Sequence, residues 1–522
     1  MFDIIIKDGQ VINGSGAPPV RADVGIKDGR IEAVGIFGGA AARTIEAAGL
    51  IVAPGFIDMH SHSDFPLLVN PRAESKIRQG VTTEVIGNCG SSAAPVTEEK
   101  LDLIKEQVDL ESLELEWDWL TMGDYLARLK QQGIALNVVP LIGHGTIRAA
   151  VMGFDDRAPT EAELVAMKEL IAQAMGEGAW GLSTGLIYAP SFYATTEELI
   201  ELSKAVAKCG GIYFSHIRGE GKTLLDAVGE AIKIGREAEI AVQISHHKAT
   251  GQENWGKVRQ SLALIDRARE AGLDVTADQY PYIAASNSLS DSLPGWMHVG
   301  GKVELLNRLR DPAICERLRQ EMAKPAGYWE NVKISYCKRN KDYEGISVQE
   351  LADLRGRDPL ESVFELLAEE EATVSIVHFA MSEGDVRMVM QHLAVMVGSD
   401  GSALATSGVL YRGKPHPRNY GTFPRVLGKY VCQEKVLPLT EAVRKMTSLP
   451  AEKLGLADRG RLAEGMWGDI TVFDPQTVCD RATYVDPHRY PDGIEYVLVN
   501  GTVVIERGEH TGRLAGRVLA HN

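Results

Sequence analysis

The chain has 522 residues and a mass of 56.8 kDa, which fits one large domain with a smaller one beside it. Hydrophobic residues make up 44% and charged residues 24%, a globular composition that argues against wholesale disorder. The formal charge of -16 argues against a general nucleic-acid-binding protein, which normally carries a basic face.

The N-terminus and the cysteines indicate the cellular compartment in which we expect the protein. Met1–Gly9 has a strand-like pattern without the basic region and cleavage site of a secretory signal. No uninterrupted apolar run reaches membrane-spanning length. The six cysteines are dispersed without a CxxC pair, so a disulfide scaffold is not predicted. We therefore expect a soluble cytoplasmic protein with neither a nucleic acid nor a membrane as partner; the sequence leaves the oligomeric state open.

The two ends of the chain share short apolar runs separated by Asp-Gly or Asn-Gly, which are typical of β-hairpins. Asp8-Gly9 and Asp28-Gly29 separate such runs near the start, and Asn500-Gly501 separates two of them near the end. We therefore predict one small β-sandwich domain formed from both termini, residues 1–54 and 460–522.

The middle of the chain alternates apolar strands with amphipathic helices. The predicted strands are Phe56–His62, Val81–Cys89, Leu136–Gly143, Gly181–Tyr188, Ile212–His216, Ala241–His246, Val275–Tyr280 and Val395–Asp400. The helices between them include Glu161–Met175, Thr196–Lys208, Leu225–Ala238 and Lys257–Ala271. This order is typical of an α/β fold with a (β/α)8 TIM-like barrel, which we place at residues 55–459.

A long interruption precedes the last predicted barrel strand. From Ile283 to Ala372 the chain contains Gly, Pro and charged helices and little barrel pattern. We predict an insertion at residues 283–345, late in the barrel. Val374–Phe379 is a ninth strand candidate, so the strand count is fixed only to within one.

The strongest local signal is the segment PGFIDMHSHSD at residues 54–64. Residues two apart on a strand point the same way, so His60 and His62 would project together into the barrel mouth. Two imidazoles on one face can hold a divalent metal, although an isolated pair is more often two polar residues at a strand end.

Further residues of metal-ligand type recur where predicted strands end. They are Cys89, His216, His246 and Asp400. Barrel active sites lie at the C-terminal strand ends, so these side chains are expected to meet at one mouth. Thiolate, imidazole and carboxylate together suit zinc. A lone cysteine is more often a structural residue, but Asn88 and Gly90 end the strand and favour an exposed Cys89.

Several motifs carry a family resemblance. The segment IVAPGFIDMHSHSD resembles the opening of the amidohydrolase superfamily. The further motifs are GVTTEVIGNCG at 80–90, WGLSTGLIYAP at 180–190, FSHIRGEG at 214–221, ISHHKATG at 244–251, GSDG at 398–401, HPRNYGTFPRVLG at 416–428 and VRKMTSLPAEKLGLADRGRL at 443–462. Together they resemble the N-acyl-D-amino-acid deacylases (D-aminoacylases) over nearly the whole chain.

The resemblance implies an enzyme that uses zinc to hydrolyse small N-acyl-D-amino acids to a carboxylate and a free D-amino acid. It implies a tightly held Zn²⁺ on Cys89, His216 and His246. It also implies a second, more weakly held metal on His60, His62 and Asp400, with Cys89 able to bridge the two. Many other amidohydrolases bridge two metals with a carboxylated lysine on the fourth strand. Gly181–Tyr188 contains no lysine, which favours a deacylase over hydantoinases and dihydroorotases.

The expected chemistry assigns further residues. Asp400 would accept the proton of a zinc-activated water and pass it to the departing nitrogen, whereas alone it would be a turn residue. The substrate α-carboxylate requires a cation or hydrogen-bond donors. By family likeness Lys248, Tyr280 and Arg418 are candidates for this role, and Tyr188 is a candidate donor to the carbonyl oxygen. The alternatives are solvated loop charges and tyrosines that pack at the barrel rim.

Two rival functions stay open at this stage. One is a related cyclic-amide hydrolase or a D-dipeptidase, and the other is a non-catalytic scaffold that kept the fold and lost its metals. Selectivity for D over L substrates follows only from the resemblance. The sequence leaves open the side-chain and acyl preferences and the occupancy of the second metal position.

Overall fold

In the computed structural model, which describes residues 1–521, strands from both ends of the chain form one nine-stranded sheet. The strands are β1 (Phe2–Val11), β2 (Val20–Lys27), β3 (Arg30–Gly35), β4 (Ala41–Glu46), β5 (Ile51–Pro54), β18 (Ile470–Phe473), β19 (Ile494–Val499), β20 (Thr502–Glu506) and β21 (Glu509–His510). β5 joins the two ends, because it pairs parallel with β1 and antiparallel with β18. Ile6, Val24 and Val472 belong to one apolar cluster under this sheet. The predicted domain limits at residues 54 and 460 stay a prediction.

Parallel strands from the middle of the chain form a barrel. The three-stranded sheet contains β6 (Phe56–Asp58), β7 (Val81–Ile86) and β8 (Asn137–Pro140). The six-stranded sheet contains β9 (Ile142–Gly143), β10 (Gly181–Gly185), β11 (Ile212–His216), β12 (Ala241–Ile244), β13 (Val275–Gln279) and β17 (Val395–Val397). β8 and β9 are one interrupted strand, and a parallel bridge between Ser61 and Gly401 brings the end of β17 back to β6. Within residues 1–521 this ring has the eight strands that the sequence predicts.

Helices cover the outside of the barrel, and most of them pack through one apolar face. They include α5 (Met122–Gln132), α6 (His144–Met152), α7 (Glu161–Gly176), α8 (Thr196–Ala207), α9 (Leu224–Ala238), α10 (Val258–Glu270), α15 (Glu383–Gln391), α17 (Leu439–Met446) and α18 (Ser448–Leu454). In α9, for example, Leu224, Val228 and Ile232 are buried at helical spacing. Further helices lie near the barrel mouth: α1 (Pro66–Val69), α2 (Glu74–Ile77), α3 (Leu101–Lys105), α4 (Leu110–Leu113) and α16 (Arg418–Arg425).

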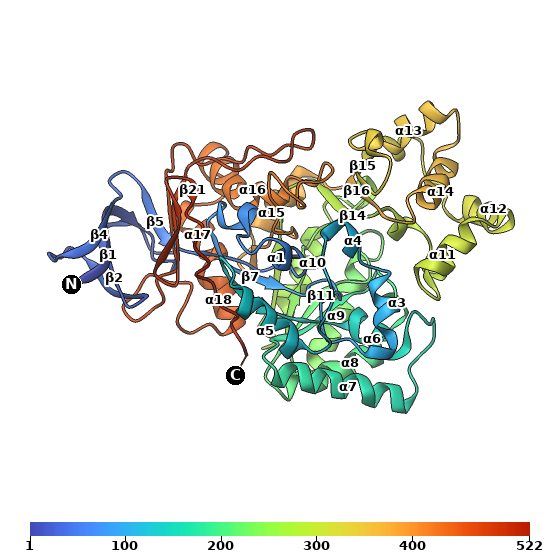
Figure 1. Ribbon diagram of the computed structural model, residues 1–522, viewed down its shortest axis with the longest axis horizontal. Helices are drawn as coiled ribbons and strands as arrows, with labels where there is room; N and C mark the ends of the chain where they lie inside the picture. The colour runs from blue at the N-terminus through green and yellow to red at the C-terminus, as the bar shows by residue number, and fades with distance from the viewer. Residues whose placement is uncertain (522) are drawn as a thin grey trace.

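Most of the segment between β13 and β17, from β14 to β16, forms a separate unit, gold and yellow at the upper right of Figure 1. Its antiparallel sheet contains β14 (Ala284–Ser288), β15 (Val332–Cys337) and β16 (Val374–Phe379). Its helices are α11 (Lys302–Leu309), α12 (Pro312–Glu321), α13 (Val348–Arg355) and α14 (Pro359–Glu369). The unit has its own apolar cluster. The ninth candidate strand is therefore β16 of this unit, and the small sheet continues past the predicted end of the insertion at residue 345.

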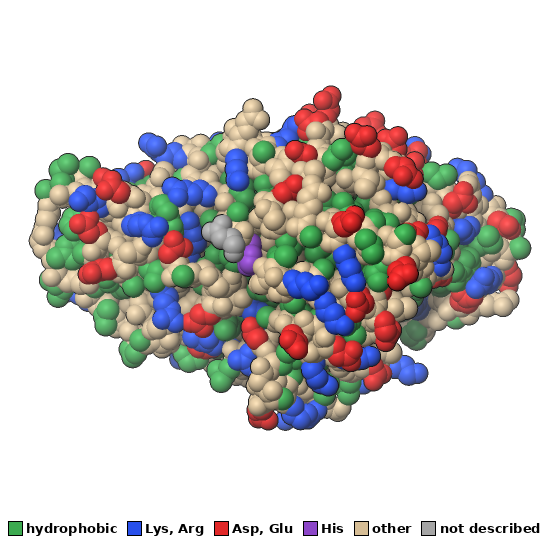
Figure 2. Space-filling model, turned by 90° about the horizontal axis from the view of Figure 1, so that it is seen from below, with side chains coloured by type: hydrophobic (Ala, Val, Ile, Leu, Met, Phe, Trp, Pro, Cys, Tyr) green, Lys and Arg blue, Asp and Glu red, His purple; other side chains and the backbone are tan. Residues whose placement is uncertain are grey.

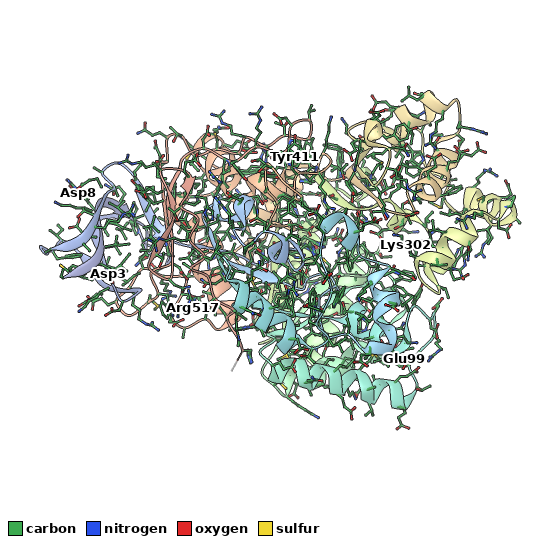
Figure 3. The ribbon with its side chains drawn as sticks, in the orientation of Figure 1. Asp3, Asp8, Glu99, Lys302, Tyr411 and Arg517 are labelled. Atoms are coloured by element: carbon green, nitrogen blue, oxygen red, sulfur yellow. The ribbon has the colours of Figure 1, made fainter. Side chains whose placement is uncertain are left out.

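The three parts follow one another along the molecule. Asp3 and Asp8 lie at the end formed by the terminal sheet, and Lys302 lies toward the other end, on the inserted unit (Figure 3). Acidic and basic side chains are interspersed over the face shown in Figure 2. In residues 1–521 we find no helix with the length and apolarity that a membrane span requires.

Candidate metal centre

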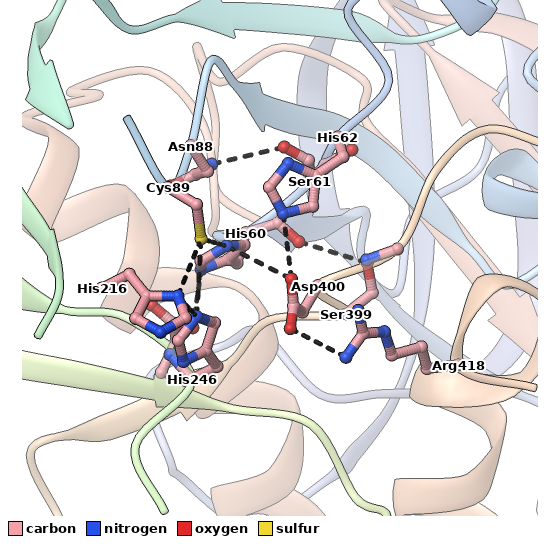
Figure 4. Close-up of polar contacts among 12 residues, drawn as sticks. His60, Ser61, His62, Asn88, Cys89, His216, His246, Ser399, Asp400 and Arg418 are labelled. Carbon is pink, nitrogen blue, oxygen red and sulfur yellow. Dashed lines mark hydrogen bonds and ion pairs between the residues drawn. The ribbon is translucent and has the colours of Figure 1, made fainter. Parts of the chain in front are cut away.

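The ends of several barrel strands bring the predicted ligands together (Figure 4). The two possible metal-holding groups are His60, His62, Cys89 and Asp400, and Cys89, His216 and His246. Within each group the ligand atoms lie within 4.8 Å of one another. Cys89 is common to both, so its thiolate lies where it can serve two neighbouring metal positions.

The Cys89 sulfur is the centre of this cluster. Its Sγ lies 3.2 Å from His60 Nε2, 3.4 Å from His246 Nε2 and 3.6 Å from His216 Nδ1. His246 Nε2 and His216 Nδ1 are 2.9 Å apart. The imidazole nitrogens therefore converge on the sulfur, as they would around a shared cation.

Asp400 closes the other side of the cluster. Its Oδ1 lies 2.9 Å from His62 Nε2 and 3.5 Å from His60 Nε2. Its Oδ2 lies 2.8 Å from Nη1 of Arg418. The Asp400 carboxylate thus contacts both imidazoles and Arg418, which the sequence analysis predicts to bind the substrate.

The backbone turns sharply at three of the cluster residues. The φ angles of Cys89, His246 and Asp400 are 53°, 35° and 51°, in the left-handed region. Such a conformation costs about 1–3 kcal/mol for a residue other than glycine and is concentrated at functional sites. Next to Cys89, a Cβ at Gly90 would lie 2.7 Å from the backbone nitrogen of Gly185, so this turn packs directly against β10.

Two carboxylates that the sequence analysis missed orient the histidines. Asp278 Oδ1 lies 3.2 Å from His60 Nδ1 and accepts a hydrogen bond from the His246 backbone N–H at 2.7 Å. Glu220 Oε1 lies 3.0 Å from His246 Nδ1. Carboxylates on the outer imidazole nitrogen fix the ring and raise its basicity as a ligand. Two features of the sequence could have identified them. Asp278 is a charged residue inside a buried strand, and Glu220 is an acid four residues after His216.

The charges of the cluster act on each other. Burial alone would raise the pKa of Cys89, but the neighbouring His60 and His246 hold it well below its usual value. Burial would also raise the pKa of Asp400, but Arg418 and His246 lower it. Burial lowers the pKa of His216, and His246 adds to the effect. A divalent metal requires a thiolate, a carboxylate and neutral imidazoles of its ligands. Although burial alone would lower them, the pKa values of His60, His62 and His246 are raised by anionic neighbours, Cys89 among them, so these imidazoles must release protons when a metal binds.

A cavity of about 480 Å³ opens onto the cluster. All four predicted substrate-binding residues line it: Tyr188, Lys248, Tyr280 and Arg418. Lys248 and Arg418 are both buried, so neither is a solvated loop charge. The Tyr280 hydroxyl is buried without a hydrogen-bond partner among the described residues, and the Arg418 guanidinium lies 4.9 Å from the centre of its ring.

Lys248 is already engaged in the structure. Its Nζ lies 2.5 Å from Glu220 Oε1 and 2.8 Å from His246 Nδ1. Lys248 therefore touches the outer side of a predicted ligand as well as the cavity. His144, a further histidine at a strand end, bonds instead to Ser191 and Glu198 and lies outside both ligand groups.

A buried lysine beneath the cluster joins the first and last barrel strands. Lys76 Nζ donates to Asp58 Oδ2 at 2.8 Å, to Ser399 Oγ at 2.6 Å and to the Gly401 carbonyl at 3.0 Å. Asp58 lies two residues before His60, and Ser399 and Gly401 flank Asp400. Lys76 therefore holds together the ends of β6 and β17, which carry His60, His62 and Asp400 of the second ligand group. The sequence did not indicate this role.

Comparison with known proteins gives matches over most of the chain. A family model for amidohydrolases matches residues 43–314 and 321–505. A D-aminoacylase of Alcaligenes xylosoxydans xylosoxydans is 40% identical over 99% of this chain and 98% of its own length. An N-acyl-D-glutamate deacylase of the same organism is 39% identical over 99% of this chain and 96% of its own length.

Solved structures match equally well. The crystal structure of N-acyl-D-glutamate deacylase from Bordetella bronchiseptica, complexed with zinc and a phosphonate inhibitor, has a TM-score of 0.85. It is 37% identical and covers 99% of both chains. A D-aminoacylase structure described with a binuclear metal centre has a TM-score of 0.85, 38% identity and full coverage of both chains. A D-hydantoinase structure has a TM-score of 0.57 and 18% identity over 99% of this chain and 98% of its own, a likeness of fold alone.

Proposed function

Because the chain belongs to the amidohydrolase family, and within it to the N-acyl-D-amino-acid deacylases, we propose that it hydrolyses N-acyl-D-amino acids with the help of zinc. The products are a carboxylate and a free D-amino acid. The observation that carries this proposal is the pair of ligand groups that share Cys89 at the barrel mouth, facing a cavity with two buried cations. A substrate with a free α-carboxylate requires such cations, and an amide requires an activated water.

The donor set fits zinc. One thiolate, imidazole nitrogens and a carboxylate are the ligands that Zn²⁺ takes in catalytic sites, and the outer nitrogens of His60 and His246 face carboxylates. Cys89, His216 and His246 would hold the first ion, and His60, His62, Cys89 and Asp400 a second. When bound, zinc acts as a Lewis acid that lowers the pKa of water to about 7 and polarises the amide carbonyl.

Residues of the chain carry out the proton transfer and bind the substrate. Asp400 lies between His62 and Arg418, where its carboxylate accepts the proton of the attacking water and then delivers it to the leaving nitrogen. This transfer lets the C–N bond break with a neutral amine as leaving group. The Tyr188 hydroxyl donates to the carbonyl oxygen. Arg418, Lys248 and the unpartnered hydroxyl of Tyr280 bind the α-carboxylate.

Two rival functions, the hydantoinase and the non-catalytic scaffold, lose support. A hydantoinase shares only the fold with this chain, and Gly181–Gly185 offers no lysine to bridge two metals. A scaffold that had lost its metals would lack ligands, whereas the residues at the mouth form both complete groups. The cytoplasmic location and the absence of nucleic-acid or membrane partners stay predictions.

The test combines metal analysis with paired substrates. We expect about one zinc or more per chain and turnover of N-acetyl-D-leucine without turnover of N-acetyl-L-leucine. Zinc in the protein without hydrolysis of either enantiomer would contradict the deacylase assignment and leave a metal-binding protein of another activity. Hydrolysis of the L enantiomer alone would contradict the stereochemistry.

A further inference from the structure

An acidic side chain from the inserted unit reaches the substrate cavity. Asp291 lies on a 3₁₀ turn (Leu289–Ser292) that directly follows β14, and it lines the same cavity as the metal cluster. Ser286 and Asn287, at the end of β14, line that wall beside it. The inserted unit therefore contributes part of the site and is more than a covering of the barrel.

The structure holds the Asp291 carboxyl group in place without neutralising it. Its Oδ2 accepts a hydrogen bond from the Ser288 backbone N–H at 3.0 Å, which closes a capping box. No donor in residues 1–521 bonds to Oδ1, and no Lys, Arg or His among them makes an ion pair with Asp291. Oδ1 of Asp291 can thus bind a group of a substrate that enters the cavity.

The cations of the cavity are occupied elsewhere. Lys248 lies 2.5 Å from Glu220, and Arg418 lies 2.8 Å from Asp400. Neither therefore supplies the counter-ion for Asp291. A carboxylate that is partly removed from water without a counter-ion is unfavourable, and burial raises the pKa of Asp291 to about 7. A cation that enters the cavity would relieve this penalty.

Asp291 lines the same cavity as Tyr188, Lys248 and Arg418, the residues proposed to bind the reacting end of the substrate. The cavity wall also includes the apolar side chains Phe65, Trp117 and Phe154.

We propose that Asp291 determines specificity by selecting N-acyl-D-amino acids that carry a cationic group in addition to their α-carboxylate. This inference rests on the proposed function, since the α-carboxylate is already assigned to Arg418, Lys248 and Tyr280. Such a substrate pairs its two charges with opposite charges in the cavity. A substrate with a second carboxylate meets Asp291 as a like charge, which disfavours it.

Two parts of the substrate can bring the cation. It can be the side chain, as in N-acetyl-D-lysine, or the acyl group, as in glycyl-D-leucine with its free ammonium group. N-acetyl-D-leucine is the neutral reference, and N-acetyl-D-glutamate carries the second carboxylate. All four are cleaved at the same kind of bond, so the change in their kcat/KM ratios when Asp291 is replaced isolates the contribution of its charge.

The experiment measures kcat/KM of the zinc-loaded enzyme on these four substrates, for the native chain and for Asp291→Asn. The asparagine oxygen still accepts the Ser288 hydrogen bond, so the turn is kept. A hydrogen bond to a charged group predicts that at least one cationic substrate exceeds the neutral reference by about 10-fold or more. Asp291→Asn should abolish that advantage, mainly through KM, and change N-acetyl-D-leucine by less than about twofold.

Control variants separate specificity from folding. Asp353→Asn removes an exposed acid from α13 of the same unit, outside the cavity, and should keep the native preference. Asp291→Ser provides a second variant in case the asparagine perturbs the turn, and it too should lose the preference.

Each result decides the proposal. Turnover of N-acetyl-D-leucine without a cationic preference, or a preference that both Asp291 variants retain, overturns the role of Asp291 alone. A higher kcat/KM for N-acetyl-D-glutamate than for either cationic substrate does the same. Failure to cleave any of the four substrates overturns the proposed function together with this inference.

Discussion

The two walls of the cavity differ in how their charges are satisfied. On the barrel wall each charge has a partner: Asp400 has Arg418 and His62, and Glu220 has Lys248. On the wall of the inserted unit, Asp291 has only a backbone N–H. The barrel wall thus holds its acids and bases in mutual pairs that fix the positions of the reacting groups and of the cations for the α-carboxylate, whereas the inserted wall presents one acid without a paired cation.

The largest expected effect is on the barrel wall, at the residue common to both ligand groups. Cys89→Ala should remove tightly bound zinc and activity together, because the thiolate connects the two groups. Zinc content and hydrolysis of N-acetyl-D-leucine are measured on the same preparation. Full activity with zinc retained would show that the sulfur is a structural thiol. Cys209→Ala, which removes an exposed cysteine, is the matched control and should change neither quantity.

The next largest effect separates metal binding from proton transfer on the same wall. Asp400→Asn should keep the fold and the zinc of the Cys89, His216 and His246 group but lower kcat by about 10²–10⁴-fold, the usual contribution of a general acid or base. Circular dichroism and zinc analysis accompany the kinetics. An active Asp400→Asn enzyme would place the proton carrier elsewhere in the cavity.

A third test addresses the rigidity of the barrel wall. Lys76→Met leaves Asp58 and Glu84 buried without their cation, so the free energy of unfolding should fall by about 3–5 kcal/mol. Urea unfolding with activity as a second probe measures the loss. Lys204→Met breaks an exposed ion pair with Glu201 and should cost no more than about 0.5 kcal/mol. Equal stability of the two variants would mean that the junction between β6 and β17 does not depend on the buried lysine.

The last test concerns the inserted wall. Because burial raises the pKa of Asp291 to about 7, the folded chain holds a proton there that the unfolded chain releases near pH 4. This contribution to stability is complete below pH 4 and is lost as the pH rises to about 7, by at most about 1.4 kcal/mol per pH unit. Asp291→Asn should lack this loss, so the difference in unfolding free energy between variant and native chain should grow from pH 5 to pH 7.5. A constant difference would mean that Asp291 is ionised throughout.

Much of the barrel, and the meeting of its strand-end side chains at one place, was predictable because the signals are local. Apolar runs gave the strands, and polar residues at their ends, such as His60 and Cys89, gave the cluster. The pattern of Val374–Phe379 does not specify its partner, so only the structure shows that β16 pairs with β14 and β15. The contacts of Lys76, Asp278 and Asp291 likewise join residues far apart in the chain, and no local pattern predicts which charge each will meet.

The most direct measurement is a zinc titration of the metal-free enzyme, followed by its rate on N-acetyl-D-leucine and N-acetyl-L-leucine. A metal-dependent centre anchored by Cys89 predicts no turnover without metal and a rise in D-specific activity as about one zinc per chain is added. Undiminished activity in the metal-free chain would contradict the central claim that this cluster is the catalytic centre.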